Sequence, residues 1–392
     1  MRSVSIVIPS RNRPRELMRC LTGVAQLSYP KFEVIVVACP KGCAIAKALP
    51  KAEHIKICAY DDTNLSDARN LGIAEAAGDI VAFLDDDAVP EPQWLNNLVD
   101  AFEDGADAVG GPLLTDGRVV SSSTNSLLET IHQIEPSARL HGANLAVRRD
   151  VLSEMNGFDP AFRFQLSVAD FQKRLEQSGH VIRQSTLAQV HHDAAENDIR
   201  HANQVPKDLY DAGFSVQIFS RKHLPAPEGK AIWHRFWEAQ RRNLFRWARR
   251  RKLNAGDISS LMQSLQSGGR DGLNHPLAPP PQIGRRSPFL AHPNKPNQEH
   301  HVLGGWMWQA SRLRKKANAL RKSGAVVTLV LLSPTWTRHS THFSDTGIWE
   351  QRGGLFGQSE LDAKKIQFWR VRARILSECE RVKAVRGAYH QD

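Results

Sequence analysis

The sequence predicts an α/β protein whose mostly parallel sheet lies between helices, and two observations carry this prediction. First, the runs 4–8, 32–37 and 80–84 are mainly Val, Ile and Phe and have the length of strands. Because these runs are nearly continuous rather than alternating, they are typical of strands covered on both faces, as in a parallel sheet. Second, a segment with apolar residues at helical spacing joins the first two runs, which predicts a right-handed βαβ unit.

The same alternation of strands and helices extends over the first 222 residues. Prolines such as Pro9, Pro30 and Pro90 stand where we expect elements to end. Further strands are predicted at 55–59, 106–111, 142–149 and 179–183, and helices at 14–27, 64–77, 94–102, 151–155 and 169–175. The stretch 112–140 is less regular, and Ser121–Thr124 within it is interpreted as a loop.

Three carboxylates, Asp85, Asp86 and Asp87, follow the apolar run 80–84 directly. They therefore lie at the carboxyl end of a buried strand, where open α/β sheets bind their ligands. Adjacent carboxylates repel one another, and hard divalent ions such as Mg²⁺ and Mn²⁺ offset that repulsion and also bind substrate phosphates. The triplet predicts a site for a metal ion and a diphosphate. The alternative is a solvated acidic turn that precedes the next helix.

Charge is distributed unevenly along the 392 residues, which carry a net charge of +11. Residues 1–200 contain 20 Lys and Arg against 27 Asp and Glu, whereas the remaining residues contain 32 against 14. A basic half of this kind can face nucleic acid, anionic lipid or acidic glycans.

Several classes of protein are excluded by composition. The five cysteines form no C-x-x-C pair, which disfavours zinc and fits a reduced, cytosolic chain. The longest apolar run, 325–332, is far shorter than the ~20 residues of a membrane helix. The N-terminal run is too short for a signal peptide. We therefore expect a cytoplasmic protein, with a peripheral place on the inner face of the plasma membrane as a further option.

The chain is expected to divide into four parts. Residues 1–222 form the α/β domain, 223–266 a basic helical segment rich in aromatic residues, 267–302 a linker rich in Pro, Gly, Asn and His, and 303–392 a small α/β accessory region of unknown role. In the last part we predict a helix at 303–323, a strand at 325–332 and a helix at 362–385.

The basic-aromatic segment at 233–251 has three interpretations. In the first, its Trp and Phe residues belong to an amphipathic helix that packs on the α/β domain. It could instead lie on a membrane surface, which would suit a lipid-linked acceptor. A nucleic-acid surface is the least favoured, because no nucleic-acid-binding motif accompanies it, and no nucleic acid partner is expected.

An ordered set of motifs resembles the inverting family 2 glycosyltransferases, which have the GT-A nucleotide-diphospho-sugar transferase fold. The matching segments are 4–13, 32–37, 68–72, 77–87, 142–144 with Arg148 and Arg149, and 157–159. They cover about residues 3–222. The resemblance implies a Rossmann-like, mixed and mostly parallel sheet between helices, followed here by a basic, mainly helical extension.

The resemblance also assigns roles residue by residue. Asp87 would hold a divalent ion, Mn²⁺ or Mg²⁺, with His191 or His192 completing the metal shell. Asp159 would lie on the acceptor side, and Asp170 would be the catalytic base. The donor side would be formed by Pro9, Arg11, Asn12, Arg13, Arg69, Asn70, Asp85 and Asp86.

Two departures from the family pattern concern the donor base and the catalytic pair. The strand 32–37 usually ends in an aspartate that reads the base, but here it continues into Ala38 and Cys39. The glutamate that usually precedes the catalytic aspartate is Ala169.

The expected function is metal-dependent, inverting transfer of a sugar from a nucleotide-diphosphate donor to a glycan, lipid-linked or other hydroxyl acceptor, in the synthesis of cell-surface polysaccharide or glycoconjugates. A contact with an anionic membrane is part of this expectation. One alternative is a sugar nucleotidyltransferase, which the absence of glycine from 9–14 disfavours. The other is a catalytically silent scaffold that binds sugar nucleotides and acts through its basic C-terminal region.

Overall fold

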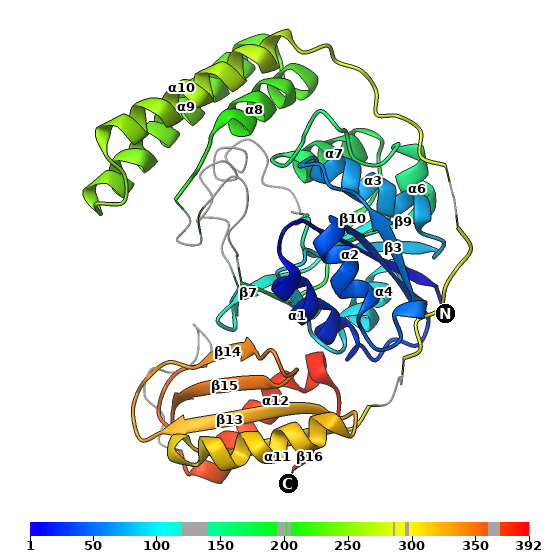
Figure 1. Cartoon of the computed structure of the whole chain (residues 1–392), viewed down its shortest axis with the longest axis vertical. Helices are drawn as coiled ribbons and strands as arrows, with labels where there is room; N and C mark the ends of the chain where they lie inside the picture. Colours follow the sequence, from blue (N-terminus) through cyan, green and yellow to red (C-terminus); the bar gives the residue numbers. More distant parts are fainter. Residues whose placement is uncertain are drawn as a thin grey trace.

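The structure, a computed structural model, describes residues 1–119, 140–193, 201, 205–284, 287–294, 298–359 and 369–391. The loop predicted at Ser121–Thr124 lies outside these residues. An N-terminal α/β domain stands between a group of three helices and a second α/β domain, so that the molecule is curved (Figure 1).

The N-terminal domain is organised around a seven-stranded sheet in the order β10-β6-β9-β4-β1-β2-β3. Its strands are β1 (Val4–Ser10), β2 (Phe32–Ala38), β3 (Ile55–Ala59), β4 (Ile80–Phe83), β6 (Ala108–Gly110), β9 (Leu145–Arg148) and β10 (Ile182–Gln184). Strand β9 runs antiparallel to both of its neighbours, β4 and β6, and the other pairs are parallel. The predicted mixed, mostly parallel sheet is confirmed.

Helices cover both faces of this sheet, as the continuous apolar strands predicted. They are α1 (Pro14–Val24), α2 (Pro40–Lys47), α3 (Leu65–Glu75), α4 (Trp94–Glu103), α6 (Arg149–Glu154) and α7 (Ser167–Gln177), and a 3₁₀ turn covers Ala52–His54. Along β1, Ile6 and Ile8 belong to one hydrophobic cluster, and Val7 belongs to the cluster on the opposite face. This alternation of faces is the reason why all seven residues of β1 are buried.

A second, four-stranded sheet begins directly after the acidic triplet. Its order is β5-β11-β7-β8, with β5 (Ala88–Pro90), β11 (Val190–His192), β7 (Leu113–Thr115) and β8 (Arg118–Val119). Strands β5 and β11 are antiparallel, and His192 is paired with Ala88. The chain segments that follow residues 87 and 189 are thereby brought side by side.

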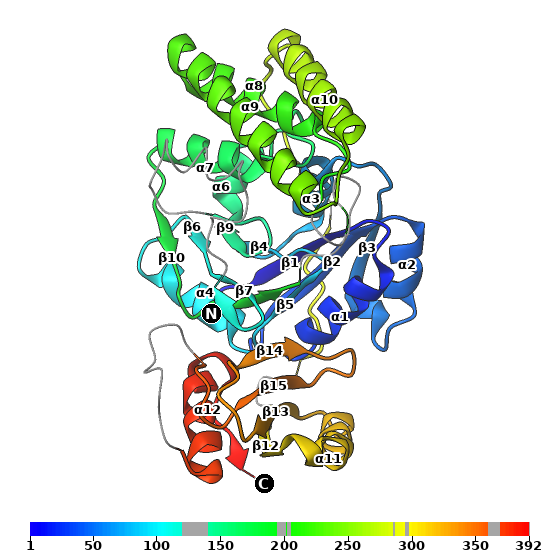
Figure 2. The ribbon, with the colours of Figure 1, turned by 90° about the vertical axis from the view of Figure 1, so that its left-hand side faces the viewer.

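Three helices, α8 (Tyr210–His223), α9 (Ala226–Arg249) and α10 (Ala255–Asn274), form the end of the molecule opposite the second α/β domain (Figures 1 and 2). Glycines allow α8 and α10 to approach closely: a Cβ on Gly268 would lie 2.0 Å from the Tyr210 carbonyl oxygen. The prediction that a linker begins at residue 267 was therefore wrong, because these glycines pack a helix interface and do not end the helix.

The segment between α10 and the second domain is docked along the N-terminal domain (Figure 1). The His292 ring stacks on Phe32 with centroids 5.1 Å apart, and the Leu290 backbone N–H donates a hydrogen bond of 2.8 Å to Glu33 Oε2. We call the described residues 287–294 the strap.

The second α/β domain has a five-stranded sheet in the order β14-β15-β13-β12-β16. Its elements are β12 (His300–Trp306), a 3₁₀ turn (Met307–Gln309), α11 (Ala310–Lys322), β13 (Val326–Ser333), β14 (Ser340–Phe343), β15 (Trp349–Gly354), α12 (Val371–Arg386) and β16 (His390–Gln391). The helix predicted at 303–323 was wrong in its first turns, because the apolar residues Val302 and Leu303 pair β12 with β13. Residues 362–368 of the predicted last helix lie outside the described residues.

Among the described helices, none combines the length and the apolar character needed to span a bilayer.

Candidate active site

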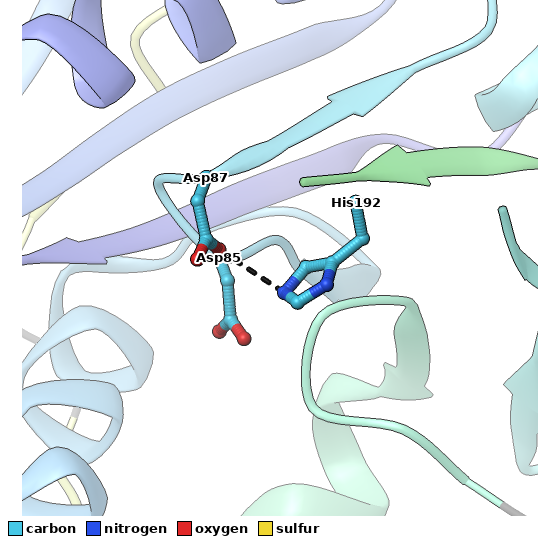
Figure 3. A group of neighbouring side chains, drawn as sticks. All are labelled: Asp85, Asp87 and His192. Atoms are coloured by element: carbon cyan, nitrogen blue, oxygen red, sulfur yellow. Dashed lines mark ion pairs between the residues drawn. The ribbon is translucent and has the colours of Figure 1, made fainter. Parts of the chain in front are cut away.

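Asp85, Asp87 and His192 come together at the carboxyl end of β4 (Figure 3). One ligand atom from each of the three lies within 4.8 Å of the others. The two aspartates belong to the short turn between β4 and β5, and His192 ends β11, the strand paired with β5. Strand pairing therefore joins two segments that are about a hundred residues apart in the sequence.

Arg13 lies against the acidic triplet from the loop that follows β1. Its guanidinium is 2.8 Å from Asp87 Oδ2 and 2.6 Å from Asp86 Oδ1. Asp86 is fully buried, and this burial raises its pKa to about 8 despite the attraction of Arg13. Asp86, predicted on the donor side, is thus ion-paired with Arg13 and is not among the residues that line the cavity described below.

The two adjacent histidines face opposite sides of β11, as successive strand residues must. His192 Nε2 lies 3.1 Å from Asp87 Oδ1. His191 is buried, with its Nε2 2.8 Å from Glu91 Oε1 and its ring 5.0 Å from that of Trp349. Of the two histidines that the metal prediction named, His192 therefore lies beside the acidic group, and the His191 side chain contacts Trp349 of the second α/β domain.

Arg69 supports Asp85 from helix α3. Its Nη2 is 3.3 Å from Asp85 Oδ1, and its Nη1 donates a hydrogen bond of 3.3 Å to Ser167 Oγ. A Cβ on Gly142 would lie 2.2 Å from Arg69 Nη2, which explains the glycine in the matched segment 142–144. Arg69 thus forms an ion pair with Asp85, and it is not among the residues that line the cavity described below.

Asn70, predicted on the donor side, is not among the residues that line the cavity described below. Its amide is occupied by the backbone of Phe158: Nδ2 donates to the carbonyl oxygen at 2.7 Å, and Oδ1 accepts from the N–H at 2.9 Å. Gly157 leaves room for this contact, since a Cβ there would lie 2.5 Å from Asn70 Oδ1. Asn70 therefore holds the turn that carries Asp159.

A cavity of about 560 Å³ opens beside the acidic group. Seven of the predicted site residues line it: Pro9, Arg11, Asn12, Arg13, Asp85, Asp87 and His192. Its other walls are Ser10, Glu16, Val37, Tyr60, Asp62, Thr63, Asn64, Leu65, Ala68, Phe164, Lys207, Asp208 and Asp211.

Some residues of the cavity lining were not predicted, although the position of two of them in the sequence indicated the site. Tyr60 and Asp62 directly follow β3, so they lie at the same edge of the sheet as the acidic triplet. Lys207 and Asp208 precede α8, and no pattern in the sequence connects them with the site.

Asp170 lies in a network of cations outside the cavity lining. It is fully buried, with Oδ1 2.7 Å from Lys222 Nζ and 2.8 Å from His223 Nε2, and Oδ2 2.9 Å from Arg174 Nε. Burial alone would raise the pKa of Asp170, but these neighbours outweigh it and lower the pKa to about 2. A carboxylate with so low a pKa is a poor proton acceptor near neutral pH.

Lys222 joins the acceptor-side and base candidates, because its Nζ is also 2.6 Å from Asp159 Oδ2. The end of α8 therefore neutralises both carboxylates. Lys222 and His223 were not predicted. They belong to a helical segment about fifty residues after Asp170, and nothing in that segment marks them as its partners.

The chemistry of the acidic group fits a divalent ion. Carboxylate oxygen is the preferred ligand of Mg²⁺ and Mn²⁺, and imidazole is a common ligand of transition metals. Asp85 and Asp87 with His192 offer such a mixed oxygen and nitrogen set at the cavity wall.

Residues 5–135 match the Glycosyl transferase family 2 model. The match covers about a third of the chain and places a Glycosyl transferase family 2 domain in its N-terminal part. The N-terminal domain has the mixed, mostly parallel sheet between helices that the resemblance implied.

Relatives agree with this assignment. Glycosyltransferase AglE of Haloferax volcanii is 30% identical over 168 residues, which are 40% of this chain and 55% of that protein. The glucosyl-dolichyl phosphate glucuronosyltransferase of the same organism is 31% identical over 116 residues, 26% of this chain and 36% of that protein. The chain thus spans about half or less of the length of these curated relatives.

Among solved structures, the chain is similar to the mannosyltransferase PcManGT from Pyrobaculum calidifontis in complex with GDP-Man and Mn²⁺. The sequence identity is 18% and the TM-score is 0.45, with 69% of this chain and 87% of that chain covered.

Proposed function

We propose that the protein is a metal-dependent, inverting glycosyltransferase that moves a sugar from a nucleotide-diphosphate donor to a hydroxyl acceptor. The observation that carries the proposal is the group of Asp85, Asp87 and His192 in the wall of the 560 Å³ cavity. Such a site can hold a divalent ion next to a space large enough for a nucleotide sugar.

Asp87 and His192, with Asp85 beside them, would hold Mn²⁺ or Mg²⁺. The bound ion would neutralise the charge that develops on the leaving diphosphate. Arg13 keeps Asp87 oriented toward the site, and Arg69 does the same for Asp85.

The donor would lie along the loop formed by Pro9, Arg11 and Asn12. Because no carboxylate ends β2, we propose that Tyr60 and Asp62 at the end of β3 contact the nucleotide base. The proposal is supported by the presence, in one short segment of the cavity lining, of an aromatic ring that can stack on a base and a carboxylate that can accept its hydrogen bonds.

Asp170 remains the proposed base, with Asp159 on the acceptor side. An inverting displacement needs one carboxylate that accepts the proton of the acceptor hydroxyl as the hydroxyl attacks the anomeric carbon. Asp170 could do this only after Lys222 and His223 withdraw, because both contact Oδ1. We propose that acceptor binding displaces the end of α8.

The acceptor is proposed to be a glycan or a lipid-linked sugar, in the synthesis of cell-surface polysaccharide or glycoconjugates at the cytoplasmic face of a membrane. Support comes from the relative whose name specifies a glucosyl-dolichyl phosphate glucuronosyltransferase.

The test is to incubate the full chain with a panel of nucleotide sugars and Mn²⁺ and to measure nucleotide diphosphate release. We expect release with at least one donor, loss of release on addition of a chelator, and loss in Asp87→Ala. Release that persists in Asp87→Ala or with the chelator would contradict the metal site.

A catalytically silent scaffold is the second candidate, and the paired state of Asp170 favours it. Donor binding without nucleotide diphosphate release from any donor, even with acceptor glycans present, would support the scaffold over the enzyme.

A further inference from the structure

Helix α9 and the three residues after it carry a dense group of exposed cations. Nine Lys and Arg side chains belong to exposed residues: Lys230, Arg235, Arg241, Arg242, Arg246, Arg249, Arg250, Arg251 and Lys252. Within the described part of the chain, Arg241 is the one member with an ion pair, to Glu238. The group therefore presents a nearly uncompensated positive charge, which we call the α9 basic face.

An exposed aromatic side chain lies in the middle of this face. Phe245 is 50% exposed, and Arg241, Arg242 and Arg249 are its neighbours three and four residues away on the helix surface. A large apolar side chain surrounded by guanidinium groups is typical of helices that lie in the headgroup region of a bilayer.

The opposite side of α9 packs inside the three-helix group. Ile232, Phe236 and Leu244 are buried in the cluster shared with α8 and α10. Cations near a helix C-terminus stabilise the helix dipole, which accounts for Arg249 and Arg250. It does not account for Arg235 or Arg242, which lie two or more turns from that end. Within the described residues, the side-chain contacts of this face stay local to α9 and the residue after it: Arg241 with Glu238 and Trp237, Arg246 with Asn243, and Arg250 with Trp247.

We propose that the α9 basic face binds the surface of a bilayer that contains anionic phospholipids. The proposal rests on the proposed function, since it would bring the glycosyltransferase domain to a lipid-linked acceptor. Charge complementarity selects the partner: guanidinium groups form paired hydrogen bonds to headgroup phosphates, while Phe245 enters the apolar boundary below them. A nucleic acid would also pair with the arginines, but its bases would find one exposed ring, Phe245, to stack on along α9, and no nucleic-acid-binding motif accompanies the helix.

The experiment is co-sedimentation of the full chain with vesicles of phosphatidylcholine alone or mixed with phosphatidylglycerol. We expect binding to the mixed vesicles that weakens as salt is added, and little binding to phosphatidylcholine alone. One basic residue near an anionic leaflet contributes roughly fivefold to partitioning. The double variant Arg242→Glu/Arg249→Glu should therefore lose more than ~25-fold in binding, and Phe245→Ser should lose less.

The matched control is Arg312→Glu/Lys315→Glu on the exposed side of α11, which makes the same change in net charge elsewhere. We expect this variant to bind like the parent chain. Equal loss in both double variants, undiminished binding of the α9 variant, or equal binding to single-stranded DNA and to vesicles would overturn the proposal. Circular dichroism checks that the α9 variants stay folded.

The outcome is independent of the enzymatic proposal, because the assay contains neither donor nor metal. Failure to bind vesicles with normal nucleotide diphosphate release would remove the membrane contact alone. Vesicle binding without release of nucleotide diphosphate would support the membrane contact and contradict the proposed transferase activity.

Discussion

Arg386 of helix α12 and Glu91, which follows strand β5, form a buried two-pronged ion pair. Arg386 Nε and Nη2 each lie 2.8 Å from one Glu91 oxygen, and Glu91 Oε1 is also 2.8 Å from His191 Nε2. The Arg386 guanidinium lies over the ring of Trp349, 4.5 Å from its centroid. The second α/β domain thus contacts one side of the strand pair β5–β11, and His192 lies on the other side, next to Asp87 in the turn before β5.

Arg386→Ala should destabilise the protein and weaken the metal site together. Removing one partner of a buried ion pair costs about 3–5 kcal/mol, because it leaves an uncompensated buried charge. We expect a loss of this size in urea unfolding and a weaker Mn²⁺ affinity in titration of the folded variant. Arg15→Ala is the control, since its ion pair with Asp345 is 81% exposed at the arginine and 59% at the aspartate and should contribute little to stability. Unchanged Mn²⁺ affinity in Arg386→Ala would show that the contact is structural only.

The same ion pair should make stability depend on pH in the acid range. Burial acts to raise the pKa of Glu91, but Arg386 and His191 outweigh it and lower the pKa from 4.5 to about 2. As the pH falls, the unfolded chain therefore binds this proton first. The stabilisation is complete above about pH 4.5 and is lost between pH 4.5 and 2, amounting to about 3 kcal/mol. Urea unfolding across this range should show a smaller decline for Glu91→Gln. Parallel declines would contradict the assignment.

His192→Ala and His191→Ala should separate two roles in adjacent residues. His192 faces Asp87, so its loss should reduce Mn²⁺ affinity by at least about tenfold with little change in stability. His191 is buried against Glu91 and Trp349, so its loss should lower the unfolding midpoint more than the metal affinity. Metal titration and thermal unfolding of the two variants give both readouts. The opposite assignment of effects would mean that β11 is rotated in the active protein.

Lys222→Met tests whether the end of α8 restrains the proposed base. Without this cation the pKa of Asp170 should rise toward its ordinary value, since Lys222 is one of the groups that lower it. We expect nucleotide diphosphate release in the presence of acceptor to persist or increase in Lys222→Met. Asp170→Asn should reduce it by about 10²–10⁴-fold. Equal loss of activity and of stability in both variants would assign Asp170 to a structural ion pair.

Much of the fold could be predicted from local sequence, because strand length, apolar character and covering helices leave periodic signals. The predicted strand 55–59 matches β3, and Asp85 and Asp87 lie at the end of β4 as expected. Contacts that depend on which way a side chain points could not be predicted in this way. His191 and His192 are equivalent in sequence, and only the pairing of β11 with β5 distinguishes them.

Long-range partners were equally out of reach. The sequence around Asp170 does not tell whether its side chain faces a cavity or pairs with Lys222. In the same way, it does not tell whether Asn70 caps a helix, binds a donor or bonds the backbone of Phe158. The glycines of α10 were interpreted as the start of a linker, but a residue that weakens an isolated helix also lets two helices approach closely. Each error arose where tertiary contacts, not local preference, decide the outcome.

The contact between Glu91 and Arg386 spans 295 residues. During synthesis, strand β5 therefore emerges long before the arginine that neutralises its neighbouring carboxylate. The strand pair gains this buried contact only after the last long helix has been synthesised. Truncations that spare the whole glycosyltransferase domain but remove α12 should consequently give an aggregation-prone chain with an unfinished metal site.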